Sequence, residues 1–349
     1  MDQNILANIE KKLTGDMEQD FAFIMKEATH FHKLEAYDMV DAIMKLFNDR
    51  YGAEGRSFVL KKLSANLEAR KKMYMDAVNL IKKGDYLKAQ ELIVKLIDTF
   101  PINRPIKENQ ILLSFNNLFE NLYYSVNYNK ENKEIVRLEE PYANYYFHLA
   151  YILFNEQDYE EALKMIDKAL IYNPLQIDAI ILSAECYYAK GEMDLFFEAI
   201  DHALLDGYNR FQLANAYYLL ARYFNSIGDK KMAQGACMLS KNYLVTENIN
   251  NLQKQIDTLT GEALDFRDVE AIKEVFHSHK IQFGPSAKVL ATLSRAITQE
   301  KQKDNTLVLY YLLSILYDIT RDPSIKNQMD ELKPKVDQLK TEIQNKKEA

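Results

Sequence analysis

Apolar residues between Pro141 and Pro174 recur at the three- and four-residue steps of an amphipathic helix, in two runs separated by a polar turn. The members of the two runs are Tyr146, Leu149, Ala150 and Leu153, then Ala162, Ile166 and Ala169. Pro141 suits the first turn of a helix, where the backbone N–H that proline lacks would have no partner. Pro174 cannot continue a helix and therefore marks its end. The segment predicts a helical hairpin.

Small side chains stand opposite large ones in this predicted hairpin. Ala150, Ala162 and Ala169 allow the two helices to approach closely, and the larger apolar side chains fill the groove between them. One hairpin cannot bury the apolar faces of both its helices. The pattern therefore predicts neighbouring hairpins of the same kind.

The same pattern returns elsewhere along the chain. A step of 34 residues from Ala150 reaches Ala184, and the same step from Ala169 reaches Ala203. A third copy, with Gly228 in its turn, begins three residues late because the connection before it is longer. A fourth copy lies upstream and consists of Met73, Ala77, Leu80, Gly84, Ala89, Ile93 and Pro101. Four copies in phase predict a stack of hairpins.

This order of small and large residues resembles the tetratricopeptide repeat, a helix–turn–helix unit of about 34 residues. The chain also looks like bacterial proteins that carry such repeats, and no enzymatic activity follows from that resemblance. Its abundant Lys, Asn, Ile and Tyr residues are typical of an AT-rich bacterial genome. The resemblance implies an all-α fold, an α-solenoid in which the hairpins form a right-handed superhelix with helical caps at both ends.

We expect three regions along the chain. Residues 1–69 form an N-terminal helical cap or, alternatively, a separate partner-binding or dimerising module. Residues 70–247 form the solenoid, and residues 248–349 form a C-terminal helical region with a diverged repeat at 284–323. The predicted solenoid units are 70–103, a degenerate unit at 104–140, 141–176, 177–210 and 214–247.

The flanking segments carry weaker patterns. A break is predicted at 51–55, after which a helix runs into the first repeat. Apolar spacing predicts one helix over 111–126, followed by a polar loop and a stretch too short for a partner helix. Further predicted elements are helices at 249–259 and around 269–276 and a hairpin of 287–300 and 305–320. Leu332, Val336, Leu339 and Ile343 have coiled-coil spacing, which Pro334 weakens.

Composition narrows the class of protein. Ten glycines and seven prolines are few for 349 residues, which favours an almost wholly helical chain. The formal charge of −7 argues against a broad surface for nucleic acid or anionic membranes, so we expect neither as a partner. No apolar run approaches the roughly 20 residues that span a bilayer, and the N-terminus lacks a signal-peptide pattern. Cys186 and Cys237 fall inside repeat helices, which fits a reducing compartment. We expect a cytoplasmic protein.

Motifs that carry chemistry are absent from the sequence. There is no phosphate-binding glycine loop, HExxH, paired CxxC or GxSxG motif. His30 and His32 are two residues apart, as are His277 and His279, and on a helix such side chains diverge. We therefore expect no metal, no cofactor and no enzymatic activity.

The first helices of successive units line the concave face of a tetratricopeptide-repeat stack, and partners of the family usually bind there. The resemblance carries this role to Asn144, Phe147, Tyr151, Phe154, Asn155, Asp178, Ile181, Glu185, Tyr188, Asn215, Tyr218, Arg222 and Asn225. Tyr74 and Val78 would extend the face upstream. The family's carboxylate clamp needs basic residues where this chain has Phe147 and Tyr151, which argues against a receptor for chaperone C-termini.

Three hypotheses follow for function. The first is a non-enzymatic scaffold or adaptor whose concave groove binds a peptide or helix of a partner protein, with aromatic and arginine side chains as anchors. The alternative is a peptide-responsive regulatory receptor whose N-terminal helices are switched by a ligand in the groove, which a short free peptide would stabilise. The third is an enzyme, which the sequence disfavours because no group is poised beside a base or a metal. A separate interpretation of the groove is that its aromatic residues pack against the chain's own C-terminal helices. The sequence indicates neither the partner nor the oligomeric state.

Overall fold

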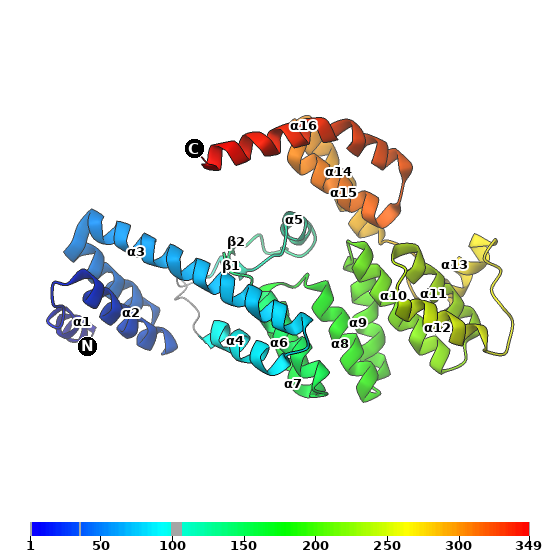
Figure 1. Cartoon of the computed structure of the whole chain (residues 1–349), viewed down its shortest axis with the longest axis horizontal. Coiled ribbons are helices and arrows are strands. Elements are labelled where there is room, and N and C mark those ends of the chain that lie inside the picture. The colour runs from blue at the N-terminus through cyan, green and yellow to red at the C-terminus, as the bar shows by residue number, and fades with distance from the viewer. Residues whose placement is uncertain (1, 35, 99–106, 349) are drawn as a thin grey trace. The chain divides into compact units, whose positions relative to one another are not determined.

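The structure, a computed structural model, describes residues 2–34, 36–98 and 107–348. Over these residues the chain is an all-α repeat solenoid apart from one two-stranded sheet. Its residues divide into two compact units, the first made of 1–114 and 132–152 and the second of 115–131 and 153–349. Figure 1 labels the elements along the chain.

The first unit contains six complete elements and most of α6. Their bounds are α1 (Asp2–Glu10), α2 (Met17–Lys33), α3 (Tyr37–Lys82), α4 (Tyr86–Asp98), β1 (Gln110–Leu113), β2 (Glu134–Arg137) and α6 (Tyr142–Asn155). Ile24, Ala28, Ile43 and Phe47 are fully buried where α2 packs on α3. Gly52, with φ 56° and ψ −133°, interrupts α3 inside the predicted break.

Helices α3 and α4 form the first predicted repeat hairpin. Ala77 and Ala89 are fully buried between large side chains, and Gly84 in the turn has a φ of 76° that favours glycine. Pro101, predicted to end this unit, lies outside the described residues. The small residues of the pattern therefore occupy the positions that their spacing predicts.

The sheet corrects the prediction of a long helix over 111–126. Strands β1 and β2 pair in parallel, with Ile111 opposite Ile135, and the helix begins only at Leu118. An ion pair between two buried side chains anchors the chain after β2. Arg70 Nε lies 2.7 Å from Glu140 Oε2. Tyr145 donates a hydrogen bond of 2.9 Å to the same carboxylate.

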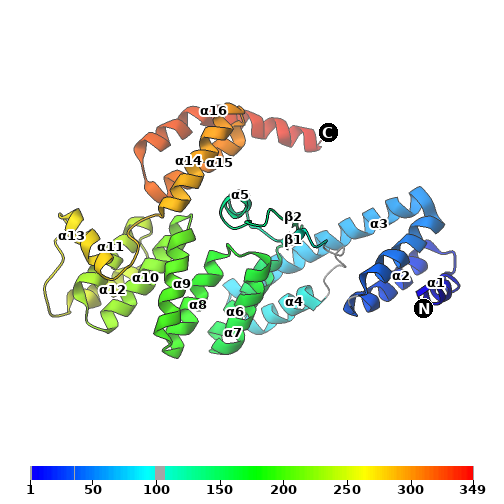
Figure 2. The ribbon, with the colours of Figure 1, turned by 180° about the vertical axis from the view of Figure 1, so that it is seen from behind.

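The second unit contains the other elements. Their bounds are α5 (Leu118–Asn127), α7 (Tyr159–Tyr172), α8 (Ile177–Lys190), α9 (Met193–Asp206), α10 (Arg210–Ser226), α11 (Lys230–Tyr243), α12 (Glu247–Asp257), α13 (Val269–Ser278), α14 (Ala287–Gln302), α15 (Thr306–Thr320) and α16 (Pro323–Glu348). Figures 1 and 2 show α8 beside α9 and α10 beside α11 from opposite sides. Ala184 and Ala203 are fully buried in the first of these hairpins.

The helices after the repeats match the predicted pattern. Helix α12 begins two residues before the predicted 249–259 and ends two residues earlier, α13 covers the predicted stretch around 269–276, and α14 with α15 forms the predicted hairpin. Ser286 caps α14 by accepting a hydrogen bond of 3.1 Å from Val289 N. Pro334 lies inside α16, where Val336 is 2% exposed.

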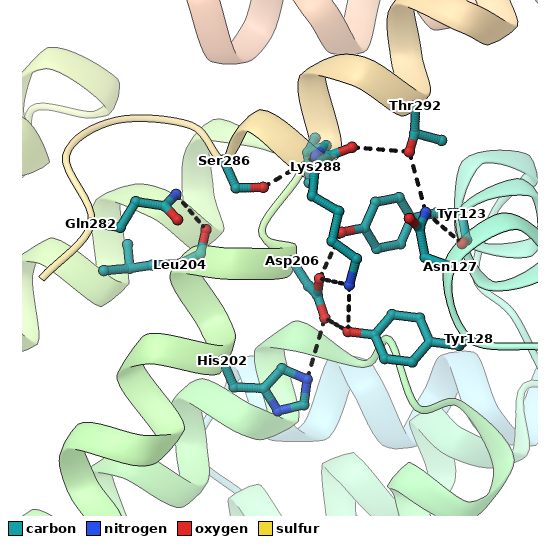
Figure 3. Close-up of polar contacts among 11 residues, drawn as sticks. Tyr123, Asn127, Tyr128, His202, Leu204, Asp206, Gln282, Ser286, Lys288 and Thr292 are labelled. Atoms are coloured by element: carbon teal, nitrogen blue, oxygen red, sulfur yellow. Dashed lines mark hydrogen bonds and ion pairs between the residues drawn. The ribbon is translucent and has the colours of Figure 1, made fainter.

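Polar contacts dock α14 and α5 against the end of α9, as Figure 3 shows. Asp206 is buried and accepts hydrogen bonds from the hydroxyls of Tyr123, at 2.6 Å, and Tyr128. Lys288 Nζ lies 3.2 Å from Asp206 Oδ1 and 4.1 Å from the centre of the Tyr128 ring. His202 Nε2 approaches the other carboxylate oxygen at 3.4 Å. We call these five residues the Asp206 cluster.

Candidate functional site

The thirteen residues predicted to line the concave face are divided between the two units. Asn144, Phe147 and Tyr151 lie on α6 in the first unit, and the other ten belong to the second. In the first unit, Phe147 and Tyr151 are half-buried, and the Tyr151 ring lies 6.5 Å from that of Tyr86 on α4. Tyr74, which would extend the face, contacts His148 Nδ1 at 3.2 Å.

The ten residues of the second unit differ in exposure. Asn155, Asp178 and Asn215 are exposed, whereas Ile181 is only 5% exposed and its side chain belongs to the core. Those that are half-buried are Phe154, Glu185, Tyr188, Tyr218, Arg222 and Asn225. Most of the predicted residues are thus open to solvent to some degree, and Ile181 is not.

Four of the predicted residues meet in one pocket. It has a volume of about 320 Å³, close to the lower end of the range for ligand pockets. Its predicted members are Glu185 of α8 and Asn215, Tyr218 and Arg222 of α10. The remaining lining residues are Ala214, Leu219, Ser240, Leu244, Thr246 and Asn248. We call this the α10 pocket.

The spacing of α10 explains how these side chains come together. Asn209 caps the helix by accepting hydrogen bonds from Phe211 N and Gln212 N, which fixes where the helix begins. Asn215, Tyr218 and Arg222 then follow at steps of three and four residues, so they share one face. The start of α12 is fixed in the same way, since Thr246 accepts from Ile249 N at 3.2 Å.

Arg222 is the central charged group of the pocket. Its guanidinium carbon lies 4.4 Å from the centre of the Tyr188 ring, within the range of a cation–π contact. Its Nη1 atom lies 3.8 Å from Glu185 Oε2, which is an ion pair but too long for a hydrogen bond. The Tyr188 ring therefore holds the arginine beside the carboxylate without closing the gap between them.

Hydrogen-bonding capacity remains unused around Arg222. Among the described residues, Arg222 Nε and Asn225 Oδ1 are buried atoms without a hydrogen-bond partner. Burial raises the pKa of Glu185, and the charge of Arg222 opposes this effect. A half-buried carboxylate with a raised pKa in a pocket is typical of a functional site.

Reasoning from the sequence missed the lining that comes from α11 and the start of α12. Ser240, Thr246 and Asn248 contribute hydroxyl and amide groups to the pocket. A signal was present, because Asn248 follows Asn215 at 33 residues, close to the repeat period. The apolar pattern fades after Tyr243, so α12 was not predicted to be the next lining helix. The C-terminal helices α14–α16 contribute no residue to the lining of this pocket.

Nucleophilic and metal-binding groups are not gathered in the part of the chain that the structure describes. Burial raises the pKa of Cys186 to about 12 and that of Cys237 to about 11, so both thiols stay protonated near neutral pH. Within the described ranges, no three His, Cys, Asp or Glu side chains are close enough to share a metal ion. No helix in those ranges has the length and apolar character needed to cross a membrane.

Comparison with known proteins shows that part of the chain matches a repeat family. A family model described as the tetratricopeptide repeat matches residues 143–175, which cover most of α6 and all of α7. No curated protein matches the chain. The match coincides with the segment whose pattern of small and large residues is the clearest in the sequence.

Proposed function

We propose that this protein, which contains a tetratricopeptide repeat, is a scaffold that binds a segment of a partner protein in the α10 pocket. Repeats of this family support protein–protein interaction in general. The proposal includes no catalytic step. The observation that carries it is the gathering of Glu185, Tyr218 and Arg222 from two repeat units in one pocket.

The composition of the pocket supports a protein ligand. Tyrosine and arginine are the residues that most often dominate protein-binding energy, and here Arg222 is supported by the Tyr188 ring. Asn215 and Asn248 each offer an amide that can both donate and accept. A main-chain segment carries the matching acceptors and donors at every residue.

Site-specific crosslinking tests the proposal in the full chain. We expect p-benzoylphenylalanine at Tyr218 to crosslink to a partner polypeptide in cells, because this half-buried side chain lines the pocket. The matched control carries the same group at Leu195, which is 42% exposed on α9 and lies outside the pocket lining. Mass spectrometry of the crosslinked band identifies the partner and the residues that it contributes.

Two results would contradict the proposal. One is a crosslinked band of the same size and strength at Leu195, which would indicate nonspecific contact. The other is the absence of any band at Tyr218 in cells where Asn215, labelled in the same way, also gives none. A change of Tyr188 to alanine removes the ring beneath Arg222 and should weaken the Tyr218 band without unfolding the chain.

A further inference from the structure

The opposite charges in the α10 pocket are separated by a gap. Glu185 and Arg222 each have a side chain that is 32% exposed, and their closest charged atoms are 3.8 Å apart. Among the described residues, the Glu185 carboxylate receives no hydrogen bond, and Arg222 Nε has no partner either. Both groups therefore keep hydrogen-bonding sites for something else.

Arg222 has a second contact besides Glu185. Its guanidinium carbon lies 4.4 Å from the centre of the Tyr188 ring, within the range of a cation–π contact. A guanidinium offers five N–H donors, and a carboxylate offers about four acceptor positions. The pocket thus presents the N–H donors of Arg222 beside the acceptor oxygens of Glu185. The positive charge of the first balances the negative charge of the second.

The balance of charge decides which ligand group fits. A carboxylate would pair with Arg222 but face Glu185 at close range, and an ammonium group would have the reverse problem. A carboxamide adds no charge, since its oxygen accepts from Arg222 while its NH₂ donates to Glu185. A volume of about 320 Å³ accommodates one such side chain with part of its backbone.

We infer that the α10 pocket selects a glutamine or asparagine side chain of the partner segment, with Arg222 bonding the amide oxygen and Glu185 the amide nitrogen. The inference rests on the proposed function and specifies what that site recognises. Backbone amides share this chemistry, but they would give no preference for one side chain over another. A preference for glutamine or asparagine at one position of the peptide therefore distinguishes a side-chain amide from a backbone amide.

Selection from a displayed library of random dodecapeptides tests the inference. The wild-type full chain should enrich peptides that share one glutamine or asparagine. In synthetic peptides, replacing that residue by Glu or Lys should weaken binding at least about tenfold in fluorescence anisotropy, because an amide hydrogen bond is lost and a like charge is met.

Two charge-removing variants should shift the preference in opposite directions. Glu185→Gln leaves Arg222 uncompensated, so acidic peptides should gain; Arg222→Gln leaves Glu185 uncompensated, so basic peptides should gain. If Arg222→Gln unfolds the chain, Arg222→Lys serves instead, and it should lose the amide preference because lysine lacks the planar fork. Glu198→Gln, exposed on α9, is the control and should leave the preference unchanged.

The outcomes separate the inference from the proposed function. Enrichment of no peptide, or binding that survives substitution of the pocket residues, would overturn both. Enrichment with an apolar or charged anchor in the pocket would overturn the amide preference and leave protein binding in place. The amide preference is likewise overturned, and protein binding stays, if the relative affinities of acidic and basic peptides are the same in both variants as in the wild type.

Discussion

Buried alanines are the residues on which the close approach of the repeat helices depends. Ala184 of α8 is fully buried, and its position follows from a step of one repeat after Ala150. An added side chain there has no free space to enter, because interiors of proteins are packed as tightly as organic crystals. The size of the side chain at such a position therefore controls how closely the two helices of the hairpin pack.

Ala184→Leu should lower the free energy of unfolding by about 1–3 kcal/mol, since overpacking forces neighbouring side chains out of their preferred rotamers. Denaturant unfolding followed by circular dichroism measures the change. Ala189→Leu is the matched control on the same helix, where the alanine is exposed and the substitution should have little effect. Equal stability of the two variants would contradict close packing at Ala184.

Asp206 links stability to pH. Burial disfavours its ionised form, but hydrogen bonds from His202, Tyr123 and Tyr128 and the charge of Lys288 outweigh this and lower its pKa from 3.8 to about 2. A depressed carboxylate pKa adds stability that is present above the unfolded-state value and disappears as the pH falls toward the folded-state value. Asp206 should therefore contribute about 2 kcal/mol above pH 4 and progressively less down to pH 2.

Asp206→Asn tests this contribution. The variant should be less stable than the wild type near neutral pH, and the difference should shrink between about pH 4 and pH 2 as the wild-type carboxylate takes up a proton. Denaturant unfolding of both proteins at a series of pH values measures the difference in their free energies of unfolding. Other carboxylates titrate in both proteins, so their contribution cancels in the difference. Asp201→Asn, exposed on the same helix, is the control. A difference that does not depend on pH would contradict the lowered pKa.

Among the elements, hairpins were predictable from the sequence and the small sheet was not. Small residues at fixed steps predict helix pairs because each pair needs them for close approach, as at Ala77 and Ala89. The apolar run 111–113 fits either a buried strand or a turn of helix, and only the segment that pairs with it decides between them. That partner, Glu134–Arg137, is too short to predict by itself.

The start of α14 depends on one side chain. Ser286 is 2% exposed and its hydroxyl accepts from Val289 N, so Ser286→Ala leaves that N–H without a partner in a buried place. We expect a loss of about 1 kcal/mol in the free energy of unfolding, while Ser286→Thr should keep most of it. Thermal unfolding of the three proteins side by side measures this. An alanine variant as stable as the wild type would mean that water replaces the cap.

At the scale of the whole molecule, the sequence predicts which residues share one face of α10. It does not predict the shape of the α10 pocket. Repeat spacing carries Asn215, Tyr218 and Arg222 to one side of α10. It says nothing of the 3.8 Å gap to Glu185, which depends on how far apart two hairpins stack. The same reason hid the Asp206 cluster, whose members come from segments without a shared repeat pattern.

Lys288→Met should loosen the C-terminal helices of the second unit. The change removes the charge that lies 3.2 Å from Asp206 and 4.1 Å from the Tyr128 ring centre, and these are contacts between α14 and the rest of the unit. Hydrogen–deuterium exchange should become faster in α14 and α15 and stay unchanged in α8 and α9. Lys303→Met, 64% exposed, is the control. Uniformly faster exchange would mean that the whole unit is destabilised instead.

The chain enters the second unit at Phe115, returns to the first at Asn132 and leaves it again after Ile152, so neither unit is one continuous stretch. During synthesis, Tyr123 precedes Asp206 by 83 residues and Asn127 precedes Thr292 by 165. The polar side chains of α5 therefore stay hydrogen-bonded to water until Asp206, and later Thr292, have left the ribosome. A nascent chain stalled at residue 200 would contain α5 without its acceptor at Asp206, and a fragment beginning at residue 153 would lack α5 altogether.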